Sequence, residues 1–219
     1  MSVSEIKQKL REEIVRVART LLETNLVLGT SGNVSAKVPG EEAVLITPSM
    51  VEYPELKPED IPLVNYDGEV LEGDKPPSTE KAMHLAVHKA RKDVGAVIHA
   101  HSLYGTVLGI VGKPLPIIID EMAIKLGGTV EVAEYRLAGT PELAEIAVKA
   151  LGNKAAVFLA NHGTLCCGRD LKEALHITQF VERMSQIYIL SMLIGKPNLL
   201  PEESVKMETE VYRLLHKVE

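Results

Sequence analysis

The segment from Pro77 to Ser102, P-S-T-E-K-A-M-H-L-A-V-H-K-A-R-K-D-V-G-A-V-I-H-A-H-S, is the stretch around which the rest of the chain is organised. Its first half predicts a helix over 79–91, and its second half a short apolar strand that ends in His99-Ala-His101. Side chains alternate between the two faces of a strand, so both histidines point the same way. Two neighbouring imidazoles at the end of a strand can chelate one metal ion.

A third histidine and a carboxylate extend this pattern. His162 follows the apolar run 155–160, and Glu80 opens the helix that leads into the His99 strand. Three imidazoles and one carboxylate that leave a coordination position open are typical of a Lewis-acid site rather than a structural one. We therefore predict that His99, His101 and His162 bind a divalent metal, with Glu80 beside it.

The helix 79–91 itself offers a rival arrangement. Glu80, His84 and His88 recur at intervals of four residues, which places them on one helix face. These three side chains could hold a metal themselves; alternatively, His84 lies behind Glu80 as its hydrogen-bonding partner. Helix faces often collect such residues by chance, so the strand histidines are the preferred ligands.

The other motifs have structural explanations that do not exclude a functional one. Ser78 and Thr79 are good helix-capping residues, and the stretch 29–33, G-T-S-G-N, is rich in turn formers. Capping and anion binding are compatible, because the N-terminus of a helix attracts negative charge. The adjacent Cys166 and Cys167 indicate strand packing rather than chemistry.

Length and charge exclude several classes of protein. The 219 residues predict a single domain spanning 1–219. A net charge of −6 without a basic cluster argues against nucleic-acid and anionic-membrane partners. The apolar runs fall short of the ~18 residues that a membrane span requires, and the charged, amphipathic N-terminus does not resemble a signal peptide. Two adjacent cysteines cannot link distant segments, so we expect a cytoplasmic protein.

Hydrophobic periodicity and turn residues predict an α/β protein with one sheet covered by helices on both faces. Ser4 is the expected cap of the first helix, Thr140 of the helix that begins at Pro141, and Asp170 of the longest helix. The expected helices are 4–24, 79–91, 102–110, 121–126, 141–151, 170–194 and 201–217, and the expected strands are 34–38, 43–47, 63–66, 70–71, 96–99, 116–119, 129–133, 155–159 and 165–167.

Five motifs together resemble those of the class II aldolase/adducin family, and within it most closely the L-fuculose-1-phosphate aldolases. The motifs are G-T-S-G-N (29–33), T-P-S (47–49), S-T-E (78–80), H-A-H (99–101) and N-H-G (161–163). Their joint occurrence in this order is far more specific than any one of them. The resemblance covers nearly the whole chain. It implies a three-layer α/β/α fold around a mainly antiparallel central sheet, one zinc ion per subunit and a homotetramer with sites near subunit boundaries.

The resemblance also implies an activity. It suggests reversible cleavage of a ketose 1-phosphate, such as L-fuculose 1-phosphate, to dihydroxyacetone phosphate and an aldehyde such as lactaldehyde. Zinc would stabilise the charge that develops on the dihydroxyacetone phosphate half, and Glu80 matches the catalytic acid/base. Hydroxyls, an amide and exposed backbone N–H groups would bind the phosphate without a basic side chain. The residues implied as phosphate contacts are Gly32, Asn33, Thr47, Ser49, Ser78 and Thr79.

Two departures from the family pattern concern the aldehyde. Glu121 stands at or next to the place of a tyrosine that handles the aldehyde from a neighbouring subunit, and Tyr212 is a candidate for a tail tyrosine that closes over the site. Other activities on the same scaffold remain open: a pentulose-5-phosphate 4-epimerase, a methylthioribulose-1-phosphate dehydratase and a non-catalytic module like the adducin head. The epimerases carry aspartate in place of Glu80, and the non-catalytic module needs no metal, so the aldolase is favoured over both. The dehydratase is also metal-dependent and carries a comparable glutamate, so the sequence does not separate it from the aldolase.

Overall fold

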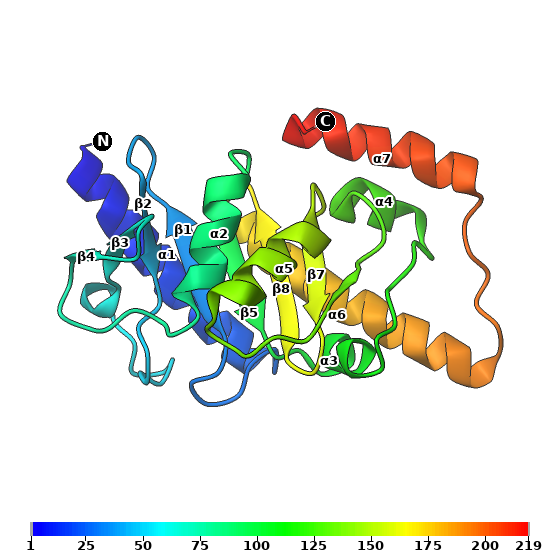
Figure 1. Cartoon of the computed structure of the whole chain (residues 1–219), viewed down its shortest axis with the longest axis horizontal. Helices are drawn as coiled ribbons and strands as arrows, with labels where there is room; N and C mark the ends of the chain where they lie inside the picture. The colour runs from blue at the N-terminus through cyan, green and yellow to red at the C-terminus, as the bar shows by residue number, and fades with distance from the viewer. Residues whose placement is uncertain (1, 219) are drawn as a thin grey trace.

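The computed structural model describes residues 2–218 and contains an eight-stranded sheet (Figure 1). The strand order is β4-β3-β2-β1-β5-β8-β7-β6, and only the β6–β7 pairing is parallel. The strands are β1 (Asn33–Lys37), β2 (Ala43–Ile46), β3 (Leu63–Asn65), β4 (Val70–Glu72), β5 (Ala96–Ala100), β6 (Val132–Ala133), β7 (Ala156–Leu159) and β8 (Gly163–Gly168). The prediction of a mainly antiparallel sheet is therefore confirmed.

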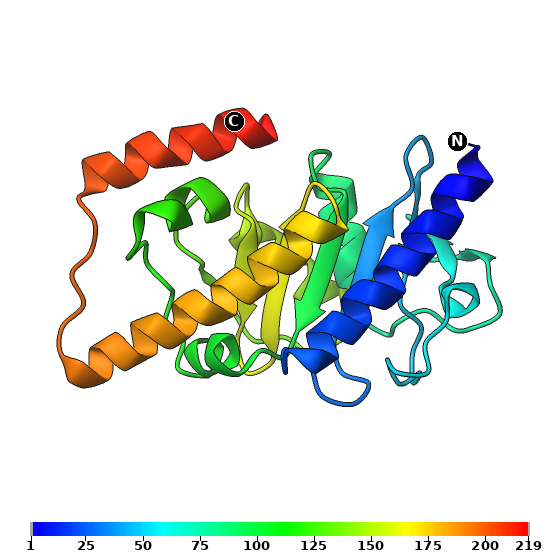
Figure 2. The same ribbon diagram turned by 180° about the vertical axis from the view of Figure 1, so that it is seen from behind.

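Helices form a layer on each face of this sheet. Helices α2 and α5 cover the face seen in Figure 1, and α1 and α6 cover the opposite face, seen in Figure 2. The helices are α1 (Val3–Glu23), α2 (Lys81–Ala90), α3 (Leu103–Ile110), α4 (Asp120–Leu126), α5 (Pro141–Leu151), α6 (Leu171–Ile194) and α7 (Glu202–His216), with a short 3-10 turn, η1 (Pro58–Asp60). Within residues 2–218, no helix combines the length and apolarity that crossing a membrane would need.

Alternation along the central strands assigns each side chain to one layer. On β1 and β5, Val34 and Ile98 pack against Ile14 of α1, whereas Val97 faces the other way and packs with Val87 of α2. His99 has the same parity as Val97. The face of β5 that carries His99 therefore faces α2, the helix that Glu80 precedes.

Two details of the predicted elements differ in the structure. The first helix is capped by Ser2, not Ser4, because the Ser2 hydroxyl accepts from Glu5 N and the Glu5 carboxylate accepts from Ser2 N. The expected strand 116–119 is absent; Leu115 and Val130 form only an isolated bridge. Prolines lack the N–H that a ladder needs, and they flank Leu115 on both sides.

Candidate active site

The three histidines predicted as ligands come together at one end of the sheet. His99 is buried near the end of β5, His101 follows that strand directly, and His162 lies in the turn between β7 and β8. The Nε2 atoms of His99 and His101 are 3.0 Å apart, and the ring centroids of the three histidines are 4.6–5.2 Å apart. Asn161 takes a left-handed conformation, φ 55°, that reverses the chain just before His162.

Glu80 completes the cluster from the other side. It is the last residue before α2, and its backbone N–H donates to Ser78 Oγ. The two carboxylate oxygens divide between two rings: Oε2 lies 3.3 Å from His99 Nε2 and Oε1 lies 3.2 Å from His162 Nε2. The carboxylate therefore points at the space on which the ring nitrogens converge.

The protonation states of these groups suit a metal site. Burial lowers the pKa of His99 to about 3, which leaves a neutral ring. Its Nδ1–H donates to the Thr164 carbonyl over 2.9 Å, so the Nε2 lone pair faces the cluster. Burial alone would raise the pKa of Glu80, but the adjacent His162 imidazole and the Asn33 amide lower it, so the group is a carboxylate.

These donors fit a divalent metal. Each of these histidines offers one ring nitrogen as a ligand. The three nitrogens, from His99, His101 and His162, lie within 4.8 Å of one another. Oε1 of Glu80, although buried, has no hydrogen-bond partner among the described residues. Three imidazoles and a carboxylate are a donor set that zinc accepts readily, with room for a further ligand.

Two glycines allow the strands to approach closely enough to build the cluster. A Cβ at Gly163, at the start of β8, would overlap the Ala100 carbonyl and lie 3.2 Å from His99 Cε1. Gly32 has φ +78°, and a Cβ there would lie 2.9 Å from the His99 carbonyl oxygen. A larger residue at either position would push apart the backbones that carry the histidines.

The segments predicted to bind phosphate are hydrogen-bonded to one another. Thr47 N donates to Val34 O, and Ser78 N donates to Thr47 O. The hydroxyls of Thr47 and Ser78 each accept from a backbone N–H, so their own protons are not used in those bonds. Ser49 Oγ donates to Pro77 O, and Thr79 is exposed.

Asn33 is engaged on both sides of its amide. It lies opposite His99 in the β1–β5 register. Its Nδ2 donates to Glu80 Oε2 over 2.9 Å, and its Oδ1 contacts His84 Nε2 at 2.5 Å. The amide predicted to contact phosphate is thus also a direct partner of the carboxylate.

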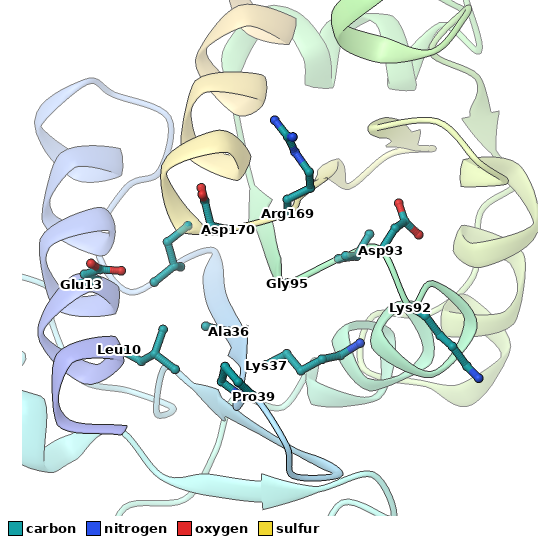
Figure 3. Close-up of a pocket in the computed structure, with 12 residues that line it drawn as sticks. Leu10, Glu13, Ala36, Lys37, Pro39, Lys92, Asp93, Gly95, Arg169 and Asp170 are labelled. Carbon is teal, nitrogen blue, oxygen red and sulfur yellow. The ribbon is translucent and has the colours of Figure 1, made fainter. Parts of the chain in front are cut away.

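Basic side chains gather at the opposite end of the sheet. Lys37 ends β1, and Lys92 and Arg169 lie near it around a cavity of about 350 Å³ (Figure 3). Arg169 is paired with Glu173 at 2.8 Å. This cavity adjoins the beginning of β5, whereas the histidines lie at its end, so these cations do not serve the cluster.

The structure does not join Glu121 or Tyr212 to the histidines of the same chain. Glu121 is exposed on α4, whose last carbonyl, that of Leu126, accepts from Ala155 N beside the far end of β7. Tyr212 is buried on α7, which packs against α4, and its ring stacks on His216 at a centroid distance of 4.1 Å.

The rival ligand set on α2 is not formed. His84 faces Asn33 and Ser35, and His88 also bonds to Ser35. Ser35 is not among the site residues predicted from the sequence. Its spacing of two residues from Asn33 on a strand nevertheless places both side chains on one face.

Comparison with known proteins agrees with this geometry. The family model described as "Class II Aldolase and Adducin N-terminal domain" matches residues 12–189. The chain belongs to this family. The aldolase names of its curated relatives agree with it, and the protein is a lyase of the class II aldolase type. The predicted family resemblance and fold class are both confirmed.

Several relatives match nearly the whole chain. A 5-deoxy-D-ribulose 1-phosphate aldolase of Bacillus thuringiensis serovar kurstaki is 39% identical and covers 91% of this chain and 93% of its own. A 5-methylthioribulose-1-phosphate/5-deoxyribulose-1-phosphate aldolase of Rhodospirillum rubrum is 33% identical, covering 93% and 91%. The solved structure of an L-fuculose 1-phosphate aldolase superposes with a TM-score of 0.89 at 38% identity, covering 94% and 96%.

Proposed function

We propose that this protein is a zinc-dependent aldolase that reversibly cleaves a deoxyketose 1-phosphate between C3 and C4. The products are dihydroxyacetone phosphate and a short aldehyde. The observation that carries the proposal is the convergence of the Glu80 carboxylate on the ring nitrogens of His99 and His162, at 3.3 and 3.2 Å. A general base beside a Lewis-acid site is the arrangement that making and breaking a bond next to a carbonyl requires.

The relatives support a substrate that lacks its terminal hydroxyl. L-Fuculose 1-phosphate would give lactaldehyde, and 5-deoxyribulose 1-phosphate would give acetaldehyde. Both sugars share the dihydroxyacetone phosphate half, which the residues of a single chain can bind, and differ in the aldehyde half. The 39% identity to a 5-deoxyribulose 1-phosphate aldolase supports that sugar alongside fuculose phosphate.

The residues of the chain have separate tasks in this reaction. A metal on the three histidines would supply electrophilic stabilisation at the ketose carbonyl. In the condensation direction, Glu80 takes a proton from C3 of dihydroxyacetone phosphate, the electron pair left on C3 forms the new bond to the aldehyde carbon, and the aldehyde oxygen takes up a proton from water. In cleavage the C4 hydroxyl gives its proton to water, the C3–C4 bond breaks, and Glu80 returns its proton to C3. Asn33 holds one carboxylate oxygen in place during both directions.

A substrate panel tests the proposal. The purified, zinc-loaded protein is incubated with L-fuculose 1-phosphate, 5-deoxyribulose 1-phosphate, methylthioribulose 1-phosphate and L-ribulose 5-phosphate, and dihydroxyacetone phosphate is measured enzymatically. We expect it to be released from at least one of the deoxyketose 1-phosphates. A 4-epimerase would instead convert the pentulose 5-phosphate to its epimer, and a dehydratase would release water from the methylthio sugar. Either result without dihydroxyacetone phosphate would overturn the proposal.

The hydroxyl groups at the start of α2 are expected to bind the phosphate. Thr79→Val should raise KM for the sugar phosphate about 10–100-fold, because a hydrogen bond to a charged group contributes about 1.5–3 kcal/mol. Thr79 is exposed, and its substitution should not disturb the fold. Steady-state kinetics check this, with Thr24→Val at the exposed end of α1 as the matched control. An unchanged KM for Thr79→Val would remove this residue from the phosphate site.

We also propose a homotetramer in the cytoplasm. Large apolar side chains are exposed along the end of α6 and the segment after it, namely Leu190, Leu193, Ile194 and Leu199. Exposed apolar clusters of this kind mark contact surfaces, and both cysteines are free and buried, as a reducing compartment favours. Light scattering should give about four times the 23.9 kDa chain mass. A monomeric mass at assay concentration would contradict the assembly and any role for a neighbour's Glu121.

A further inference from the structure

A line of buried polar side chains runs away from Glu80 between β1 and α2. Asn33 and Ser35 lie on the same face of β1, and His84 and His88 lie one turn apart on the facing side of α2. Asn33 Oδ1 is 2.5 Å from His84 Nε2, His84 Nδ1 is 2.7 Å from Ser35 Oγ, and Ser35 Oγ is 2.9 Å from His88 Nε2. Asn33, Ser35, His84 and His88 are each 3% exposed or less, so water does not compete for these bonds.

The direction of every bond in this line follows from its first member. A carboxylate only accepts, so Asn33 must present its NH2 to Glu80 and its carbonyl oxygen to His84. His84 must then carry its proton on Nε2, which leaves Nδ1 as an acceptor. The single proton of the Ser35 hydroxyl goes to that Nδ1, so the Ser35 oxygen accepts from His88 Nε2–H.

Both imidazoles are neutral, as this assignment requires. Burial lowers the pKa of His84 to about 4 and that of His88 to about 3. The Val94 backbone raises the pKa of His88, but by less than burial lowers it. Nδ1 of His88 nevertheless has no hydrogen-bond partner among the described residues, which fits a proton held on Nε2.

We infer that Ser35, His84 and His88 are positioning residues that lock the Asn33 amide with its NH2 group toward Glu80 and the ligand. The inference deepens the proposed aldolase function and rests on it. An amide free to rotate by 180° would present its carbonyl oxygen to the carboxylate, and the two oxygens would repel each other. His84 prevents this rotation, because only a carbonyl oxygen can accept its Nε2–H.

The locked amide has a consequence for substrate. With one N–H on Glu80 Oε2 and Oδ1 turned to His84, the second N–H of Asn33 is the group that the side chain can offer to a ligand. Asn33 therefore acts as a donor at the site. Its partner on the substrate is an oxygen that carries negative charge, such as phosphate or an ionised hydroxyl.

The tautomers provide a test that does not depend on catalysis. Nitrogen-15 NMR of histidine-labelled protein should show His84 and His88 as neutral Nε2–H tautomers from pH 5.5 to 8. Each signal is assigned by its loss from a variant in which that one histidine is replaced. In Ser35→Ala, His84 loses the donor to its Nδ1 and should show a mixture of tautomers. A wild-type His84 with its proton on Nδ1 would overturn the inference, whatever the enzyme cleaves.

Kinetics then separate positioning from a general effect on structure. Loss of a residue that orients a site group typically costs about 10–100-fold, so Ser35→Ala should lower kcat about 10-fold with zinc content unchanged. Ser185→Ala is the matched control, because Ser185 is also fully buried and its hydroxyl has no partner among the described residues. The melting temperature of both variants shows whether the fold is retained.

Substitution of His84 distinguishes hydrogen bonding from packing. His84→Leu fills the space without a donor and should lower kcat about 100-fold, whereas His84→Gln restores an N–H to Asn33 and should recover about 10-fold of that loss. Equal kcat in the two variants, or a wild-type kcat in Ser35→Ala, would overturn the inference. If no sugar phosphate is cleaved by the wild type, the proposed function fails, while the tautomer result still decides the orientation of Asn33.

Discussion

Replacing Glu80 with glutamine is expected to slow aldol cleavage about 10²–10⁴-fold, the usual contribution of a general base. Glutamine keeps the size of the side chain and an oxygen that can accept from Asn33, so the fold and the bound metal should be retained. It cannot take a proton from C3 of dihydroxyacetone phosphate. The measurement is the exchange of that C3 proton with deuterium from solvent, followed by NMR, because exchange isolates proton abstraction from later handling of the aldehyde.

The control for this experiment is Glu182→Gln. Glu182 is another partly buried glutamate, and it accepts from Tyr104 N and Gly105 N at the start of α3. That variant should keep wild-type exchange. Exchange at the wild-type rate in Glu80→Gln would show that another group is the base, and His162 would be the next residue to test, since its Nε2 is 3.2 Å from the carboxylate.

Replacing His162 with alanine is expected to remove the metal. A metal held by three imidazoles loses a direct bond, which should cost more than the about 10–100-fold in affinity that loss of an outer partner costs. The turn that carries His162 lies between two buried strands, β7 and β8, so the variant should still fold. Metal content after dialysis, measured by mass spectrometry, and proton exchange should fall together.

His176→Ala is the matched control for His162→Ala, because His176 is exposed on α6 and its ring stacks on Phe180. It should keep one zinc per chain. Near-stoichiometric, tightly held zinc in His162→Ala would contradict the ligand assignment and would direct attention to Glu80 as the third ligand with His99 and His101.

The three-histidine cluster could be predicted because local rules place its members. Strand alternation puts His99 and His101 on one face, and an apolar run followed by Asn161-His162-Gly163 marks the end of a buried strand at which a loop begins. The position of Glu80 just before a helix also follows from sequence. What local rules omit is the pairing of β5 with β8, which sets His99 opposite Leu165 and so carries His162 to the same edge.

The orientation of Asn33 needed the tertiary structure. From sequence, Asn33 belongs to a turn motif and His84 and His88 to a helix face, and nothing local shows that β1 lies against α2. Packing of these two elements excludes water, and most buried polar atoms must then bond to one another. The chain from Glu80 to His88 is the result of that requirement.

The sequence alone therefore determined the α/β class, through periodicity and turn residues, and the family resemblance, through the five motifs. The mainly antiparallel sheet was implied by that resemblance, whereas strand alternation and residue type indicated the residues able to hold a metal. The tertiary structure decided which polar side chains meet. Tyr212 is buried on α7, where that helix packs against α4, and not beside the histidines. His84 and His88 hydrogen-bond to Ser35 rather than binding a metal. The physical reason is that a buried side chain bonds to whatever element packs against it, and strand order and helix packing are set by the whole core rather than by any one segment.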